Sequence, residues 1–288
     1  HRDHGATAAT ASGLRTGNFE ETHEDGSIET TTYANGQPVS STIAHLDGST
    51  TTMDYENGSL VSSMTISHDE SGVITSRTKS LYDDGEMSSS ETRTYDQTGA
   101  AISGYVRDGS GQVIETVQVE QNDNDEFVES ITTAYRNGQP IDSKTVHQDE
   151  SITTTAYSNG QPVSSETVHP DRWTTLAKYS NGQLNSTEIK DESGEVKEEG
   201  VNDYREDGSL EQISITNRIS DFHATVKYDH DGAGCRYEKN DPEGRVLERH
   251  AEQYDAEGQI SYQSTGNREE GFIDTRFNEA GHIERIEK

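Results

Sequence analysis

Residues 33–55 read YANGQPVSSTIAHLDGSTTTMDY, and this stretch is one copy of a phrase that recurs along the chain. The opening Tyr-x-Asn-Gly returns with steps of 22 residues, from Tyr33 to Tyr55 and again from Tyr157 to Tyr179. Self-similarity at a fixed period of this length is typical of repeat architectures. The sequence therefore indicates an architecture more clearly than an activity.

Each copy of the phrase contains two turns and two strands. Asn35-Gly36 is a strong signal for a two-residue hairpin turn, because both residues tolerate the positive φ that a type I′ turn needs. The second turn contains His45-Leu46-Asp47, and the segments between the turns are rich in Thr, Ser, Val and Tyr, which suit a pleated surface. We therefore predict an all-β chain, a repetitive antiparallel β-hairpin meander that forms an extended, twisted or spiralling single sheet.

The alternation along the strands predicts a thin sheet with one weakly apolar face and one polar face. Residues two apart point to the same face of a strand. We expect one set of side chains to be more buried than another. The first set is Val39, Ile43, Tyr55, Val163 and Tyr179, and the second is Thr42, Thr50 and Thr52.

Composition narrows the classes of protein. Leu, Ile, Val and Phe supply only 45 of 288 residues, which suits disorder or a repeat in which each unit is buried on its neighbours; the regular turns favour the repeat. A net charge of −31 excludes direct nucleic-acid binding and contact with an anionic membrane surface, because no surplus of Lys or Arg exists. No apolar run is long enough to insert into a membrane. The single Cys235 excludes a disulfide framework.

The repeat and the composition divide the chain into three regions. Residues 1–17 lack the repeat, and we expect this leader to be poorly ordered. Residues 18–190 are Ser/Thr-rich hairpin repeats. Residues 191–288 are more charged and use a Tyr-Asp-x-x-Gly style, and we expect them to continue the preceding sheet.

Several phrases of the chain resemble a known repeat. Tyr95-Asp96-Gln97-Thr98-Gly99 and Tyr254-Asp255-Ala256-Glu257-Gly258-Gln259-Ile260 are similar to the YD repeats of Rhs, wall-associated and teneurin-type proteins. The Tyr-x-Asn-Gly phrase also resembles a variant MORN repeat. The first resemblance implies a long spiralling sheet on a secreted or cell-surface protein, in some members a shell around a toxin. It implies no catalytic residue.

One departure from the repeat marks a candidate ligand site. Ser27, Ser49 and Ser151 lie six residues before their tyrosines, and Trp173 holds that place before Tyr179. A departure from register is a place where function is grafted onto a scaffold. Trp173 and Arg172, together with Tyr157 and Tyr179 one repeat apart, are the predicted ligand-binding residues, in the form of a platform for a sugar. The alternative is that Trp173 is an additional packing residue.

Other polar patterns are interpreted as structural. Aspartate in the His-x-Asp turns is favoured by its hydrogen bonds to the backbone, so we predict no metal site and no cofactor. Acidic turns such as residues 122–126 leave structural Ca²⁺ as an alternative. The Thr-x-Thr pairs, such as Thr50 with Thr52, leave ice binding as a further alternative, although Glu, Asp and Lys interrupt the rows of threonines.

Three hypotheses about the function remain open. The first hypothesis is a non-enzymatic β-repeat scaffold, extracellular or at the cell surface, that presents a long surface for adhesion, matrix or assembly contacts with a glycan or protein partner. The second is a polysaccharide-active enzyme, a lyase or phage-type depolymerase with a shallow cleft on the sheet. A third is the shell fragment of an Rhs-type toxin. No catalytic residue is identified, and the sequence does not define the ligand or the oligomeric state.

Overall fold

The computed structural model describes residues 14–122, 124, 126–229, 234–255, 259–278 and 283–287. These residues form 23 strands and no helix, and strands account for well over half of the chain. Among them there is accordingly no helix of membrane-spanning length and hydropathy. The predicted all-β class is confirmed.

The chain divides into two compact units, residues 1–148 and residues 149–288. The strands of the first unit are β1 (Gly17–Thr22), β2 (Ile28–Ala34), β3 (Gln37–Ala44), β4 (Thr50–Glu56), β5 (Ser59–His68), β6 (Ile74–Asp83), β7 (Glu86–Tyr95), β8 (Ala101–Asp108), β9 (Val113–Gln121), β10 (Phe127–Arg136) and β11 (Gln139–His147). The strands of the second unit are β12 (Ile152–Ser158), β13 (Gln161–Val168), β14 (Thr174–Ser180), β15 (Gln183–Lys190), β16 (Val196–Tyr204), β17 (Leu210–Asn217), β18 (Phe222–Tyr228), β19 (Gly234–Asn240), β20 (Val246–Tyr254), β21 (Ile260–Asn267), β22 (Gly271–Phe277) and β23 (Ile283–Glu287).

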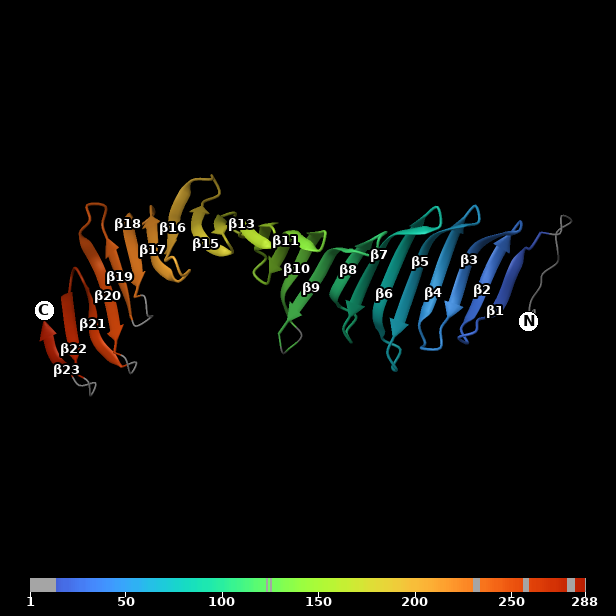
Figure 1. The fold of residues 1–288 in the computed structure, drawn as a ribbon, viewed down its shortest axis with the longest axis horizontal. Coiled ribbons are helices and arrows are strands. Elements are labelled where there is room, and N and C mark those ends of the chain that lie inside the picture. Colours follow the sequence, from blue (N-terminus) through green and yellow to red (C-terminus); the bar gives the residue numbers. More distant parts are fainter. Residues whose placement is uncertain are drawn as a thin grey trace. The chain divides into compact units, whose positions relative to one another are not determined.

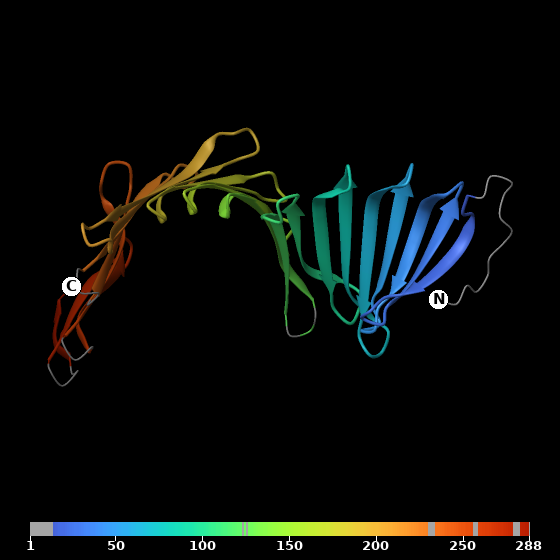
Figure 2. The same ribbon diagram turned by 45° about the vertical axis from the view of Figure 1, so that its right-hand side comes forward.

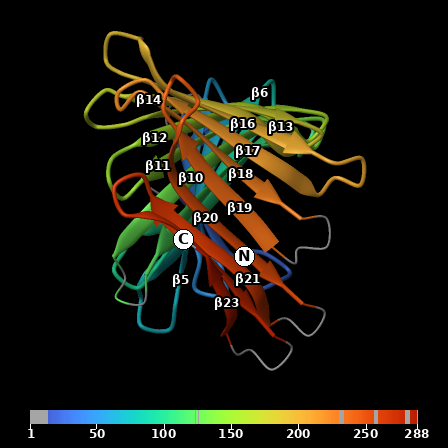
Figure 3. The same ribbon diagram turned by 90° about the vertical axis from the view of Figure 1, so that its left-hand side faces the viewer.

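Within each unit every strand pairs antiparallel with the next strand along the chain. The strands of the first unit therefore lie side by side in chain order (Figures 1 and 2), and those of the second unit do the same (Figure 3). This arrangement confirms the predicted hairpin meander. The composition boundary at residue 190 differs from the division into units after Gln148, and most of the predicted leader, residues 1–13, lies outside the described residues.

The Asn-Gly turns have the predicted geometry. Asn35 and Gly36 have φ of 51° and 84°, and Asn57-Gly58, Asn137-Gly138, Asn159-Gly160 and Asn181-Gly182 repeat this pair of positive values. Two successive positive φ angles define the type I′ turn, whose twist matches that of the flanking strands. Each such turn therefore fixes the register of the hairpin that it closes.

A β-bulge follows each of these turns, and it explains why part of the predicted burial was wrong. Tyr33 lies opposite Pro38 and Thr32 lies opposite Ser40, so Val39 has no partner across the strands, and Val163 is placed in the same way. The two valines are 41% and 40% exposed, so their predicted burial was wrong. The bulge inserts one residue, which the simple alternation of faces does not include.

The rest of the predicted burial order is largely confirmed. Ile43, Tyr55 and Tyr179 are half-buried, and Thr42 and Thr52 are exposed. Thr50 is an exception, since it is half-buried as well.

Each sheet is a single layer, and this limits what it can bury. In the described residues, only small side chains reach the buried class. They are Ala177, Ala224, Ala251, Ser27, Ser41, Ser49, Ser80, Ser90, Ser143, Ser151 and Ser264. Larger side chains on adjacent strands cover the small ones. In the described residues no second layer covers the larger side chains, which stay half-buried or exposed. The sheet therefore depends on its backbone pairing and on cross-strand contacts more than on a hydrophobic core.

The second turn of the repeat provides a test of backbone strain. Gly48 has φ of 82°, and a Cβ built there would meet nothing within 4 Å. We predict that Gly48→Ala destabilises the fold by about 1–2 kcal/mol through the left-handed backbone alone. Gly48→Asn is the matched control, because Asn tolerates this conformation, and we expect it to cost less. Equal losses for both variants in chemical denaturation contradict this explanation.

The repeat also predicts which deletion the sheet accepts. Removal of residues 34–55 joins Tyr33 to Glu56 and takes out two strands, so the following strands keep both their direction and their faces. Removal of residues 34–44 takes out one strand and turns the following strands to the other face. We expect the first deletion to retain a cooperative thermal transition and the second to melt at a clearly lower temperature. Equal melting of the two variants contradicts the repeat register.

Candidate functional site

The better-covered face of the first unit carries rows of hydroxyl groups. We call it the tyrosine face, because Tyr33, Tyr55 and Tyr82 lie on it. The strand register aligns Thr51, Thr65, Thr78 and Thr92 across β4–β7. Their side chains form hydrogen-bonded pairs, with 2.9 Å between Thr51 and Thr65 and 3.0 Å between Thr78 and Thr92. These cross-strand bonds stabilise neighbouring strands in the absence of a second layer.

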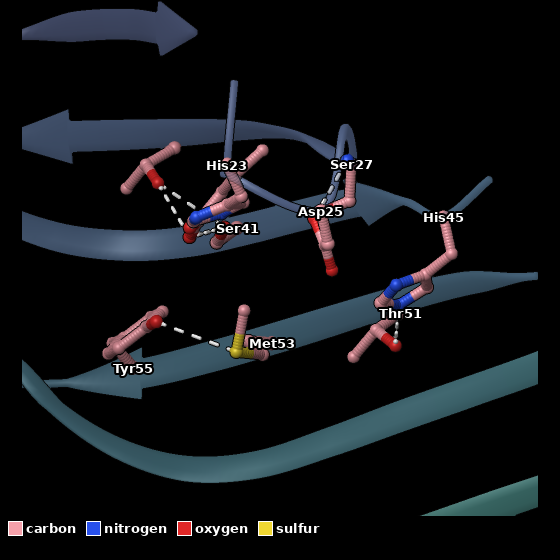
Figure 4. Close-up of polar contacts among 10 residues, drawn as sticks. His23, Asp25, Ser27, Ser41, His45, Thr51, Met53 and Tyr55 are labelled. Atoms are coloured by element: carbon pink, nitrogen blue, oxygen red, sulfur yellow. Dashed lines mark hydrogen bonds and ion pairs between the residues drawn. The ribbon is translucent and has the colours of Figure 1, made fainter. Parts of the chain in front are cut away.

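The second turn of each repeat is held by its aspartate. Asp47 Oδ1 accepts hydrogen bonds from the Ser49 backbone N at 2.8 Å and from Ser49 Oγ at 2.6 Å. Asp25 and Ser27 repeat the arrangement, and Figure 4 shows this pair beside the neighbouring turn. The same Asp-x-Ser bonds recur in further turns, at Asp69, Asp108, Asp149, Asp191 and Asp207.

These bonds give the turn aspartates a structural role. Hydrogen bonds donated by Ser27 and Ser49 hold the pKa of the Asp25 and Asp47 carboxyls below the ordinary value. In the part of the chain that the structure describes, no three His, Cys, Asp or Glu side chains gather in a way that could hold a metal ion. Two carboxylates of the acidic turn at 122–126, Asp123 and Asp125, lie outside the described residues.

The histidines of the second turns point along the sheet. His45 Nε2 lies 2.8 Å from Thr51 Oγ1, as Figure 4 shows, and His169 Nε2 lies 3.0 Å from Thr175 Oγ1. In the first repeat a carboxylate takes the place of the threonine, and His23 Nε2 lies 3.0 Å from Glu29 Oε2. These three histidines thus connect their turns to the strand that follows, whereas His147 Nδ1 lies 3.3 Å from Glu129 Oε2 of the earlier strand β10.

Trp173 occupies the serine position of its turn, as the sequence register predicts. The backbone N of Trp173 donates to Asp171 Oδ1 at 3.0 Å, which preserves the backbone half of the Asp-x-Ser motif. Arg172 occupies the glycine position with φ of 68°, a conformation that side chains rarely adopt. Trp173 is half-buried and Arg172 is exposed. Glu150 holds the glycine position of the preceding equivalent turn with φ of 67°, so this turn differs from that one only at the serine position, where Trp173 lies.

The structure does not bring the four predicted residues together. Arg172 and Trp173 lie in the turn before β14, while Tyr157 and Tyr179 lie at the other ends of β12 and β14, next to the Asn-Gly turns. Six residues separate Trp173 from Tyr179, a distance of roughly 20 Å along an extended strand. The residue paired with Trp173 across the turn is His169, whose backbone N donates to the Trp173 carbonyl at 2.9 Å. The sequence reasoning did not include His169 in the site.

The sequence reasoning did not identify a second surface feature, a hollow in the sheet of the second unit. One face of β19–β23 carries a hollow of about 510 Å³. It is lined by Arg236, Gln253, Ser261, Tyr262, Asp274, Arg276, Phe277, Glu284, Arg285 and Glu287. Three arginines from three strands reach it, in a chain with only 23 basic residues against 54 acidic ones. No local sequence motif marks them, because they come together only through the register of the strands.

Comparisons with known proteins do not assign a family. No family model matches the chain, and no curated protein matches it. Among solved structures, a porin-like protein from Bacteroides uniformis is 10% identical, with 91% of this chain and 92% of that chain covered and a TM-score of 0.27. Two structures of the fusion TcdB2-TccC3 are 11% and 12% identical over 91% of this chain, with TM-scores of 0.22 and 0.20. This chain covers 19% and 21% of those proteins. At these TM-scores the similarities do not establish a common fold or activity.

The turn aspartates predict how stability changes with pH. A carboxyl whose pKa is depressed in the folded state stabilises the fold above its unfolded pKa of about 3.9, and this contribution disappears as the pH falls through the folded value. We therefore expect the triple variant Asp25→Asn, Asp47→Asn and Asp69→Asn to melt below the wild type at neutral pH. The difference should shrink as the pH falls below about 3.9 and through the depressed pKa values of the folded state.

A charge-matched control separates this effect from general repulsion among carboxylates. Glu20→Gln, Glu21→Gln and Glu56→Gln remove the same charge from exposed side chains. This variant should melt at or above the wild-type temperature at neutral pH, because it relieves repulsion without removing a turn bond. Identical pH profiles for the two triple variants contradict the role assigned to the aspartates.

Proposed function

We propose that this chain is a non-catalytic β-hairpin-repeat scaffold, extracellular or at the cell surface, which presents its sheet to a glycan or protein partner. The observation that carries the proposal is the single-layer sheet of each unit. Large apolar and aromatic side chains of its strands remain exposed, among them Val201 at 47%, Leu81 at 43% and Phe127 at 40%. A surface without a covering layer offers a partner both faces and the turns at both edges.

The repeat supports a binding role in a second way. The register places equivalent side chains at regular steps across the strands, roughly 4.8 Å per strand. Repeating ligands such as polysaccharides match such a lattice, because each repeat of the protein offers the same contact to the next residue of the ligand. The resemblance of the Tyr-Asp-x-x-Gly phrases to YD repeats agrees with a location outside the cell.

The turn at Trp173 is the first contact that we assign to this function. It has an exposed arginine next in sequence to a half-buried tryptophan, and Arg172 takes the left-handed conformation that Glu150 also takes in the preceding equivalent turn. Backbone strain and broken register persist at functional sites more often than elsewhere. A planar indole next to a cationic group is suited to stack on a sugar ring.

Trp173→Ser tests this contact. The substitution restores the Asp-x-Ser turn, so we expect the melting temperature to stay unchanged or to rise. Binding on a glycan array should weaken by about 1 kcal/mol, the contribution of one stacked aromatic ring. Phe127→Ser is the matched control, because it removes an exposed aromatic side chain outside this turn.

Three outcomes contradict the proposal. Binding that stays unchanged in Trp173→Ser, together with a large loss of stability, makes Trp173 a packing residue. Release of unsaturated uronate products from a bound polysaccharide identifies a lyase in place of a scaffold. Absence of binding by the wild-type chain to any glycan or defined matrix protein removes the proposed surface role.

A further inference from the structure

Two arginines in the hollow of β19–β23 have no counterion. Arg236 and Arg276 are both exposed, and neither makes an ion pair within the part of the chain that the structure describes. By contrast Arg93, Arg218 and Arg245 each lie within 3 Å of a carboxylate oxygen. Other described arginines, Arg77 and Arg136 among them, also make no ion pair, so Arg236 and Arg276 are distinguished by their shared position around one hollow.

The strand register places like charges together in this hollow. Tyr262 lies opposite Arg276, which lies opposite Arg285 on β23. Two like charges directly opposite each other destabilise an antiparallel pair. Arg285 is also paired with Glu287, so Arg276 is the member of this pair whose charge is left uncompensated.

Two small side chains lie on the same face as the hollow, beside its lining residues. In the adjacent row of the same face, Arg236 lies opposite Ala251, and Ala251 lies opposite Ser264. Ala251 is 3% exposed and Ser264 is 0% exposed, because the longer side chains around them rise above both. The longer side chains of Arg236, Tyr262 and Arg276 therefore surround a depression.

Three acidic residues line the hollow: Asp274 and Glu287 are each paired with an arginine other than Arg236 and Arg276, and Glu284 is exposed. Asp274 Oδ1 accepts hydrogen bonds from Ser264 Oγ at 2.5 Å and from Tyr262 OH at 3.2 Å, and it lies 2.9 Å from Arg249 Nη2. The bond from Ser264 and the charge of Arg249 hold the pKa of the Asp274 carboxyl below its ordinary value. Asp274 is thus engaged in a fixed network and does not compensate Arg236 or Arg276.

We propose that this hollow binds an acidic polysaccharide, with Arg236 and Arg276 holding the oxyanion groups of the ligand and the ring of Tyr262 lying against a sugar. Guanidinium groups bind carboxylate and sulfate oxygens through paired, charge-assisted hydrogen bonds. Carboxylate and sulfate substituents share this chemistry, so both kinds of polysaccharide fit the site. This inference rests on the proposed surface function and gives the class of ligand.

The overall charge favours a polysaccharide over an acidic protein. An acidic protein would bring a broad negative surface against a chain with 54 carboxylates. A single polysaccharide strand is narrow enough to lie in the hollow, and screening over about 8 Å at physiological ionic strength weakens repulsion from carboxylates further away. The hollow spans β19–β23, so it is long enough to contact more than one sugar residue.

Calorimetric titration of the whole chain tests the site. The probes are an oligoglucuronate, a sulfated oligosaccharide and a neutral oligosaccharide of the same length. We expect the wild type to bind one or both acidic probes and the double variant Arg236→Gln, Arg276→Gln to lose at least about tenfold in affinity, since a hydrogen bond to a charged group contributes about one order of magnitude. The acidic probe that binds more tightly identifies the oxyanion.

The double variant Arg218→Gln, Arg245→Gln is the matched control. It removes the same two charges from the same unit, at arginines paired with Glu199 and Asp241 outside the hollow, and we expect less than about a twofold change. Tyr262→Phe keeps the aromatic ring and removes the hydroxyl that donates a hydrogen bond to Asp274. We expect this variant to retain its affinity for the acidic probes. Because the substituted arginines are exposed, both arginine variants should melt close to the wild-type temperature.

The outcomes separate this inference from the proposed function. If the wild type binds acidic oligosaccharides and the double variant binds them equally well, the hollow is not the site, while the surface function stands. Equal affinity for the neutral probe also overturns the inference, since the arginines would then not recognise charge. Binding of polyglutamate in place of any oligosaccharide overturns the assignment to a polysaccharide. If the wild type binds no glycan, the inference fails, and the surface function then depends on a protein partner alone.

Discussion

The structure depends on the pairing of each strand with the next one along the chain, whose register is fixed by short turns. At Asn35-Gly36 two positive φ angles close a hairpin, and at Asp47 two hydrogen bonds from Ser49 close the turn that leads to the next one. Because every contact between strands is local in sequence, a low content of large apolar residues is sufficient. The same constraint explains why the largest residues that become buried are serine and alanine.

A single layer changes what the side chains do. In a two-layer sheet the inner face supplies a core, whereas here the tyrosine face is stabilised by cross-strand pairs such as Thr51 with Thr65 and by histidines that reach the next strand, such as His45. The acidic groups lie largely at turns and exposed positions, where repulsion keeps separate sheets apart. Stability and exposure of the sheet therefore have one origin, the single layer, and the proposed binding role rests on the surface that this layer leaves uncovered.

The repeat made the fold predictable from the sequence, whereas the candidate site could not be predicted in the same way. Asn-Gly turns, strand composition and the period from Tyr33 to Tyr55 were sufficient to predict an all-β meander, and the register placed Trp173 correctly in the serine position of its turn. Val39 was assigned to the covered face because alternation alone does not include a bulge. Tyr179 was grouped with Trp173 because the two residues are only six apart in the same repeat, although they lie at opposite ends of β14. Arg236 and Arg276 were missed because only the register of β19–β22 places them around one hollow.

The central claim is that backbone pairing without a covering layer holds the sheet together. Residue-resolved amide hydrogen exchange of the native chain tests it most directly. The account predicts protection of paired amides in the interior strands of both units, irrespective of which face the side chain takes, and rapid exchange at the central residues of the turns. Protection confined to a few apolar clusters, with fast exchange in Ser/Thr-rich strands such as β4–β7, would contradict it.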